Sequence, residues 1–149
     1  MTGRPLKLIS IIVACICIQT GAICQAEEEF NGPFPSWADV KKRFGAKGDG
    51  RTDDTKALQN AIDGLADRSI SYKSGPGAYT IIYLPAGTYR ISQTLQLRGK
   101  VGISIIGEDP SRTIIKWYGN SNDTMLWANG SAFFRLSRIS LYGDRKSVV

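Results

Sequence analysis

Histidine is missing from this sequence of 149 residues. Its absence excludes histidine triads, histidine general bases and histidine-ligated zinc sites. Cysteine is scarce as well, and all three copies, Cys15, Cys17 and Cys24, lie near the N-terminus. A mature chain that begins after Cys24 contains no thiol, so neither a disulfide scaffold nor a metal–thiolate site is available to it.

Charge of one sign is not concentrated anywhere in the sequence. Lys and Arg total 19 and Asp and Glu total 13, which gives a net charge of +6 at pH 7. The positive residues are scattered, and this argues against a nucleic-acid partner. A hydrophobic content of 42% with 21% charged residues excludes a disordered, collagen-like or coiled-coil chain. The length suffices for one folded domain.

The N-terminal segment has the pattern of an export signal. Arg4 and Lys7 precede an apolar run at 8–18, and small residues precede a cleavage site after Ala26. The apolar run is too short to cross a bilayer, so we expect no stable membrane span. We predict that residues 1–26 form a secretory signal peptide. The mature protein, with its net charge reduced to +4 by the loss of Arg4 and Lys7, is then secreted or periplasmic.

A second use of this leader stays open. Ile12, Val13, Ala14 and Cys15 resemble a bacterial lipobox, and cleavage there would leave Cys15 as a lipidated N-terminus. A lipid chain on Cys15 would anchor the protein at the cell envelope.

The start of the mature chain is predicted to contain an arm, a loop and one helix. Residues 27–38 are acidic at first and then contain glycine and proline, which predicts a flexible arm. Three glycines within 44–50 require a tight loop. Apolar residues then recur at helical spacing, which predicts a single amphipathic helix at about 54–66, with Asp53 or Asp54 as its N-cap.

From residue 81 onward the pattern changes to short runs of β-forming residues separated by Gly, Pro, Asn and Asp. The runs cover 81–84, 89–91, 95–97, 103–106, 114–117, 125–127 and 134–141. They begin roughly ten residues apart, which is typical of a β-sandwich or a β-solenoid.

Two details bear on the choice between these folds. The Asn-Gly pair at 129–130 would suit a hairpin, but most other connections lack such a turn signal. The paired isoleucines at 105–106 and 114–115 favour a parallel solenoid, in which a strand that turns a corner can bury both members of a pair. The residues alone leave both folds open.

Three segments carry a resemblance to a known family. FGAKGDGRTDDTKALQ at 44–59 resembles the opening signature of the pectate lyase superfamily. IYLPAGTYRI at 82–91 is similar to the second signature of that group, and the later IIGE and TII segments are similar to a third. Related N-termini occur in polygalacturonase-like glycoside hydrolases and in phage tailspikes.

The resemblance implies an all-β solenoid, a right-handed single-stranded parallel β-helix with an N-terminal capping α-helix. The domain would cover 39–149 as the N-terminal part of a truncated solenoid. A first coil without a cap exposes unpaired strand edges and apolar groups, and the predicted helix could cover them. We expect structural roles in this cap and its loop for Gly45, Gly48, Asp49, Gly50, Asp53 and Asp54.

The catalytic residues stay unknown. Glycoside hydrolysis normally needs two carboxyl groups across a groove. Polygalacturonases carry an Asn-Thr-Asp element, an Asp-Asp pair and a His-Gly element in later coils, and none of these has a counterpart in the β-region here. The carboxylates of that region are expected to be solvated turn residues: Glu108, Asp109, Asp123 and Asp144.

Lyases of this superfamily typically use a basic residue together with calcium that offsets the uronate charge. Arg135 and Arg138 could face an acidic polymer, although an outward, solvated side chain is the favoured interpretation of each. We expect no cofactor and no metal site in this part of the protein, and Ca²⁺ only if the whole protein is a lyase. Four aromatic residues could stack on sugar rings, but we favour burial within the coils for Trp117, Tyr118, Trp127 and Tyr142.

The favoured function is the start of an exported polysaccharide-degrading enzyme, a lyase or glycoside hydrolase that acts on a uronic-acid polymer. The sequence ends at Val149 without a closing helix or loop, so we expect a fragment whose catalytic coils are missing. The alternative is a non-catalytic β-helix for carbohydrate binding or adhesion. Both interpretations take a polysaccharide as partner and leave oligomer formation open.

Overall fold

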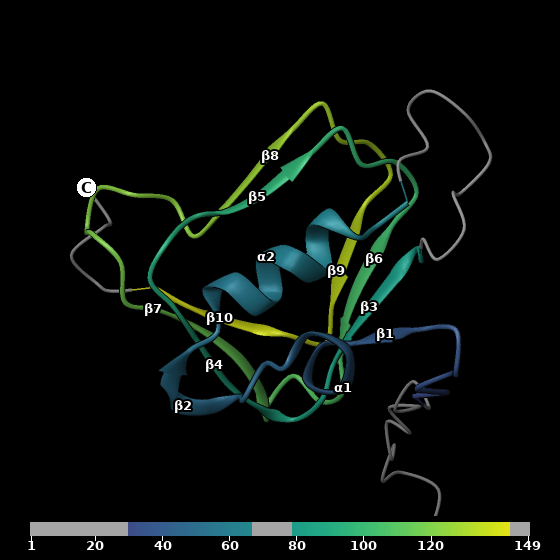
Figure 1. Cartoon of the computed structure of the whole chain (residues 1–149), viewed down its shortest axis with the longest axis horizontal. Coiled ribbons are helices and arrows are strands. Elements are labelled where there is room, and N and C mark those ends of the chain that lie inside the picture. Colours follow the sequence, from purple (N-terminus) through teal and green to yellow (C-terminus); the bar gives the residue numbers. More distant parts are fainter. Residues whose placement is uncertain (1–29, 67–78, 144–149) are drawn as a thin grey trace, which may run out of the picture. The chain divides into compact units, whose positions relative to one another are not determined.

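The computed structural model describes residues 30–66 and 79–143. The predicted signal peptide, the lipobox and Asp144 lie outside these residues. The helices and strands, in chain order, are β1 (Ala38–Asp39), α1 (Val40–Phe44), β2 (Asp49–Asp53), α2 (Thr55–Asp63), β3 (Ile81–Leu84), β4 (Gly87–Ile91), β5 (Leu95–Arg98), β6 (Ser104–Gly107), β7 (Thr113–Trp117), β8 (Leu126–Asn129), β9 (Arg135–Ser137) and β10 (Ser140–Tyr142) (Figure 1).

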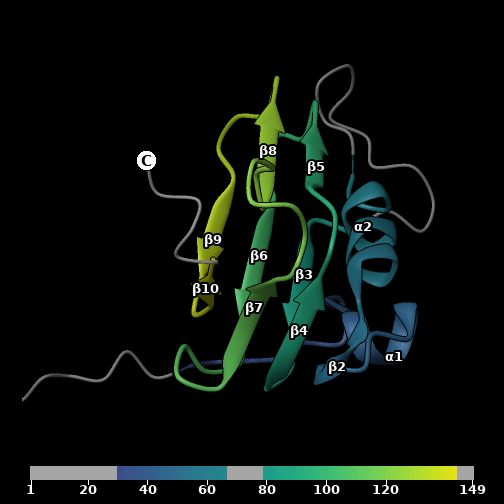
Figure 2. The same cartoon turned by 90° about the vertical axis from the view of Figure 1, so that its left-hand side faces the viewer.

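The strands form three sheets with parallel pairing. One sheet has the order β1-β3-β6-β9, the second has the order β2-β4-β7-β10, and the third pairs β5 with β8. From β3 onward the chain visits the three sheets in turn, so each strand lies beside its counterpart from the next passage (Figure 2). The prediction of a mostly β fold with parallel sheets is confirmed. The continuous right-handed solenoid with a helical cap stays a prediction.

Side chains alternate between the core and the outside along these strands. In β4 Tyr89 and Ile91 are buried, and their register partners Ile115 and Trp117 in β7 are buried too. The prediction that both isoleucines of a pair are buried is wrong, because 105–106 and 114–115 lie within strands β6 and β7 rather than at corners. Successive side chains of a strand point to opposite faces, so one isoleucine of each pair is buried and the other is half-buried.

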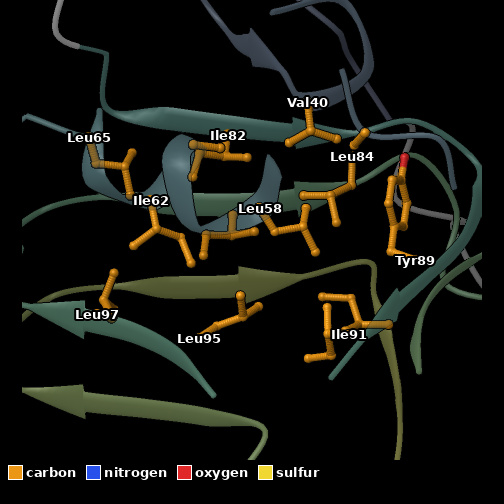
Figure 3. Close-up of a cluster of buried hydrophobic side chains, with 14 of the residues drawn as sticks. Val40, Leu58, Ile62, Leu65, Ile82, Leu84, Tyr89, Ile91, Leu95 and Leu97 are labelled. Carbon is orange, nitrogen blue, oxygen red and sulfur yellow. The ribbon is translucent and has the colours of Figure 1, made fainter. Parts of the chain in front are cut away.

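Helix α2 contributes one apolar face to the same core. Leu58 and Ile62 are buried and lie among the strand residues Ile82, Leu84 and Leu95 (Figure 3). The polar face of α2 lies outside this cluster. The helix ends at Asp63, with Gly64 as its C-cap, and is therefore shorter than the predicted 54–66. In the part of the chain that the structure describes, no helix is long and apolar enough to cross a membrane.

A short helix, α1, contradicts the prediction of a single helix. The Asp39 carboxylate accepts hydrogen bonds from the backbone N–H groups of Lys41 (2.9 Å) and Lys42 (3.0 Å) and so caps the helix. Gly45 ends it with φ +75°. Ala38, assigned to the flexible arm by composition, is fully buried and pairs with β3.

The prediction of one β-run at 134–141 is also wrong. It forms two strands, β9 and β10, in different sheets. Arg138 lies between them with φ +58°, a conformation that breaks a strand and turns the chain. The Asn-Gly pair at 129–130 forms no hairpin with its neighbours, because β8 pairs in parallel with β5 and Gly130 with φ +63° leads the chain onward.

Candidate functional site

The glycine-rich loop and the start of α2 form one connected structure around a buried carboxylate. Asp54 is 1% exposed, and its two carboxylate oxygens accept hydrogen bonds from the N–H groups of Lys47 (2.7 Å) and Gly48 (2.9 Å). Asp54 occupies the predicted N-cap position, but its side chain makes no capping bond and holds the loop instead. The Gly48 carbonyl accepts from Thr88 N–H in β4, so the loop also attaches to the sheet.

Asp49 and Asp53 make further local contacts in this segment. The Asp49 carboxylate accepts from Thr52 and Arg51, which lowers the pKa of this exposed group to about 2. Burial raises the pKa of Asp53, but hydrogen bonds from Ser92 and Thr55 and the nearby charge of Arg90 outweigh it and lower the pKa. Both acids are therefore held in their charged forms by the fold.

Glycine is required by the backbone at the remaining loop positions. Gly45, Gly48 and Gly50 have φ values of +75°, +62° and +72°. A Cβ at Gly48 would also lie only 3.0 Å from the Lys41 side chain and 3.1 Å from the Tyr89 ring. All six residues proposed for the cap and loop thus have contacts or conformations that belong to the connection between α1, α2 and β4.

A polar groove of about 870 Å³ lies between the outer face of α2 and the segment that leads into and out of β5. Its cations are Lys56, Arg98 and Lys100, and its acids are Asp53 and Asp63. Amide and hydroxyl side chains complete the lining: Thr55, Gln59, Asn60, Ser92, Gln93, Thr94 and Gln96. Such a surface offers hydrogen-bond donors and acceptors to a hydroxylated ligand.

Part of this lining is fixed by contacts within the protein. Gln59 donates to Asp63 (2.8 Å) and exchanges hydrogen bonds with the backbone of Gln96, so α2 is tied to β5. Lys100 Nζ donates to the Leu65 carbonyl at 2.8 Å beyond the end of α2. These bonds give the groove a rigid floor and leave Lys56 and Arg98 as its exposed cations.

One exposed aromatic side chain contacts a cation of the groove lining. Trp127 in β8 is 41% exposed, and the Arg98 guanidinium lies 5.4 Å from its ring centroid. An exposed ring can stack on a sugar, and a cation beside the ring can bind the carboxylate of that sugar. The groove and Trp127 together therefore suit an acidic carbohydrate better than an apolar ligand.

The predicted carboxylates of the β-region do not converge on the groove. Glu108 accepts from Ala86 N–H (2.9 Å) and from the Tyr83 hydroxyl, and these bonds lower its pKa. Asp109 accepts from the Ser111 hydroxyl and N–H, which lowers its pKa in the same way. Asp123 is an exposed turn residue. Within 30–66 and 79–143, no cluster of three or more Asp or Glu side chains is arranged to hold a metal ion.

The burial of the arginines and aromatic residues differs in part from the prediction. Arg135 is exposed, as expected, but Arg138 is half-buried and donates two hydrogen bonds to the Glu108 carbonyl. Trp117 is buried, and its indole N–H donates to the Asn120 carbonyl at 3.1 Å. Burial is the wrong prediction for the three other aromatic residues, which are 41–63% exposed: Tyr118, Trp127 and Tyr142.

Comparison with known families explains this architecture. Residues 37–139 match the family described as rhamnogalacturonase A/epimerase, pectate lyase-like. The chain belongs to this family. The match begins just before β1 and ends between β9 and β10, so it covers both helices, the glycine-rich loop and the groove. The predicted resemblance to the pectate lyase superfamily is confirmed.

Related proteins of this family act on polysaccharides. The chain is 36% identical over 115 residues to mannuronan C5-epimerase AlgE1 of Azotobacter vinelandii, a stretch that covers 70% of this chain and 8% of that protein. It is 41% identical over 80 residues to alginate lyase 7 of the same organism, covering 50% of this chain and 8% of that one. The chain therefore spans less than a tenth of the length of either relative.

Solved structures agree on the fold. ORF18 of Geobacillus virus E2 matches with a TM-score of 0.59 and 28% identity, over 70% of this chain and 20% of that chain. The catalytic domain of Agl-KA matches with a TM-score of 0.51 and 19% identity, over 73% of this chain and 19% of that domain, and it supports the fold alone.

The groove was not predicted from the sequence. Its α2 side was visible as the polar helix face that carries Lys56, Asn60 and Asp63. Its other side comes from residues within 92–100, which become neighbours of α2 only in the folded chain. The signal that would have indicated a site is the unusual density of amides on both segments, Gln59 and Asn60 on the first and Gln93 and Gln96 on the second.

Proposed function

We propose that this chain is the N-terminal part of an exported enzyme that acts on a uronic-acid polymer by lyase or epimerase chemistry. The observation that carries the proposal is the 36% identity to a mannuronan C5-epimerase, together with the 41% identity to an alginate lyase. Because the chain covers 8% of each relative, the catalytic residues are expected in further coils. A glycoside hydrolase remains the less favoured enzyme class.

The groove beside α2 supports a role of this chain in holding the polymer. It combines exposed cations at Lys56 and Arg98 with hydroxyl and amide groups, and the Trp127 ring lies against Arg98. A uronate polymer presents a carboxylate and several hydroxyls on every sugar, so both kinds of group find partners. The groove would then bind one end of a polymer whose reacting sugar lies over the later coils.

The finer features of the fold belong to the same proposal. Helix α2 would act as the lid of a right-handed solenoid, since its apolar face joins the core of the first coil. Residues 1–26 would direct export. If the complete protein is a lyase, its Ca²⁺ would bind in the later coils.

The direct test is to express the complete reading frame and incubate the purified protein with mannuronan, alginate and polygalacturonate. Ultraviolet absorbance of unsaturated sugars reports lyase activity, NMR of the polymer reports epimerisation, and new reducing ends without unsaturation report hydrolysis. A parallel incubation with a calcium chelator tests the metal requirement. Failure to alter any uronate polymer would overturn the enzyme proposal, and binding without turnover would support the non-catalytic alternative.

The role of the groove has its own test in the same protein. Arg98→Gln removes a cation beside Trp127, and we expect KM for the uronate polymer to rise about tenfold with little change in kcat. Arg112→Gln removes an exposed arginine outside the groove and serves as the matched control. Equal KM values for the two variants would contradict a polymer-binding role of the groove.

A further inference from the structure

A second group of cations and aromatic rings lies on the outer face of the β4–β7 pair. Arg90 and Lys116 are direct register partners on these two parallel strands, so their backbones are about 4.8 Å apart. Both cations lie over the ring of Tyr118: its centroid is 4.4 Å from the Arg90 guanidinium carbon and 5.2 Å from Lys116 Nζ. We call Arg90, Lys116 and Tyr118 the basic–aromatic stripe.

The stripe has positive charge that the described residues neutralise only in part. Like charges directly opposite each other on neighbouring strands are unfavourable, and within the described ranges neither Arg90 nor Lys116 forms an ion pair. Asp53 is aligned with Arg90 on the other side, but its carboxylate accepts hydrogen bonds from the Ser92 and Thr55 hydroxyls. Asp53 therefore offsets only part of the Arg90 charge, and the exposed Lys116 remains available to an external anion.

The Arg90 guanidinium also keeps donors that no acceptor among the described residues uses. Its Nη1 donates to the Arg51 carbonyl at 3.2 Å. Its Nε is buried yet has no hydrogen-bond partner in the described part of the chain. Because Nε is buried, an external ligand can meet only the Nη groups of this guanidinium, and their positive charge favours an acidic ligand over a neutral one.

An aromatic face beside these cations adds selectivity for a sugar. Tyr118 is 45% exposed, and Tyr142, the register partner of Lys116 on β10, is 63% exposed. The row Arg90, Lys116, Tyr142 thus crosses three strands at right angles to the chain direction. The strand spacing is comparable to the length of one sugar ring, so a polymer that runs across the strands presents successive carboxylates to successive strands.

We propose that the basic–aromatic stripe is a second binding site for a polyuronate, separate from the groove. The groove is formed by α2 and the β5 segment, whereas the stripe lies on the sheet that contains β4, β7 and β10. The polymer runs across the strands, with its carboxylates on Arg90 and Lys116 and a sugar against the exposed part of the Tyr118 ring. The choice of polyuronate rests on the proposed function; the location of the site does not.

The test compares binding of alginate to the complete protein and to Arg90→Gln/Lys116→Gln, measured by titration calorimetry at low salt. We expect Kd to rise about tenfold or more, since two charge-assisted contacts are lost. Lys47→Gln/Arg112→Gln removes the same charge from exposed positions outside the stripe and is expected to leave Kd within about twofold. Thermal unfolding of each variant checks that the fold is intact.

Two further measurements identify the contacts. Carboxyl-reduced alginate, a neutral polymer of the same backbone, is expected to bind equally weakly to wild type and to the double variant. Tyr118→Phe is expected to keep binding and Tyr118→Ala to weaken it, because the ring face and not the hydroxyl makes the contact.

The outcomes separate this proposal from the proposed function. Two results would overturn the proposal that the stripe binds alginate. One is equal alginate affinity of wild type and Arg90→Gln/Lys116→Gln; the other is an equal loss of affinity in the Lys47→Gln/Arg112→Gln control. Turnover of a polyuronate in that case would leave the proposed function intact. If alginate affinity depends on the stripe but the protein turns over no polymer, the binding-site proposal is supported and the enzyme proposal is overturned.

Discussion

The first and last passages of the chain around the core have the same backbone pairing but differ in burial. Leu84, Ile91 and Leu97 of β3, β4 and β5 are at most 1% exposed. Leu141 of β10 is in register with the buried Ile115, yet it is 48% exposed. Strands β3 and β4 have a paired strand on both sides, whereas β9 and β10 end the order of their sheets among the described residues. Register therefore sets the direction of a side chain, and neighbours on both sides bury it.

The largest expected effect is the loss of a core side chain in the first passage. Ile91→Ala should lower the free energy of unfolding by about 2–5 kcal/mol, because it leaves a cavity in a fully buried site. Leu141→Ala in the 149-residue chain should cost less than about 1 kcal/mol, because its side chain remains half in water. Urea denaturation of both variants measures the difference.

The same pair of substitutions also sharpens the fragment proposal. If further coils cover β10, Leu141→Ala in the complete protein should cost as much as Ile91→Ala. A small cost in both contexts would contradict such coverage.

The buried carboxylate gives the next largest effect. Asp54→Ala removes the acceptor of two backbone N–H groups and should cost about 2–3 kcal/mol in unfolding free energy. Asp123→Ala, in an exposed turn near β8, should change it by less than about 0.5 kcal/mol. Thermal denaturation of both variants provides the measurement. Equal stabilities would mean that the Asp54 bonds do not hold the loop.

A substitution at Gly107 tests the close contact between β6 and the corner that follows β9. A Cβ at Gly107 of β6 would collide with the Arg138 carbonyl oxygen, so Gly107→Ala must displace the corner between β9 and β10 and should cost about 1–3 kcal/mol. A methyl group at Gly143 would meet no atom within 4 Å, so Gly143→Ala is the control and should be nearly neutral. Calorimetric melting of the two variants measures this contrast, and a neutral Gly107→Ala would contradict the close approach.

The smallest effect at neutral pH concerns Tyr83 of β3. Burial, followed by the charge of Glu108 and the hydrogen bond to it, raises the pKa of Tyr83 to about 12. The folded-state pKa lies above the ordinary value of 10.0, so this contribution to stability is present below pH 10 and lost as the pH rises through about 12. Burial raises the pKa of Tyr79 and Tyr89 as well, so ultraviolet titration should show several late phenols, one of which disappears in Tyr83→Phe. An unchanged titration curve in that variant would contradict the assignment.

The regular elements of the fold could be predicted because they depend on local patterns. The apolar face of α2 and six of the seven β-runs follow from the periodicity of the sequence, and the structure has each of them within a few residues. Helix α1 could not be predicted in this way, since five residues make too few turns to show a period. The break between β9 and β10 depends on Arg138 adopting a positive φ, which nothing in its residue type indicates.

The site was less predictable than the fold. The roles of the loop residues follow from glycine conformation and from the tendency of Asp to bind backbone N–H groups. The groove and the basic–aromatic stripe depend on side chains such as Gln59 and Gln96, or Arg90 and Lys116, that are brought together only when the chain folds. Tyr118 and Trp127 were assigned to the core on the average behaviour of aromatic residues, but the folded chain leaves both rings exposed.

The parallel pairing of each strand with its counterpart from the next passage has a kinetic consequence. No pairing joins the two ends of the described chain, so each new passage closes only a short loop before it gains its hydrogen bonds. Assembly can then proceed in one direction, with the edges of β3, β4 and β5 serving as templates for β6, β7 and β8. A chain of this kind can begin to fold from its helical end before its last strands have been made.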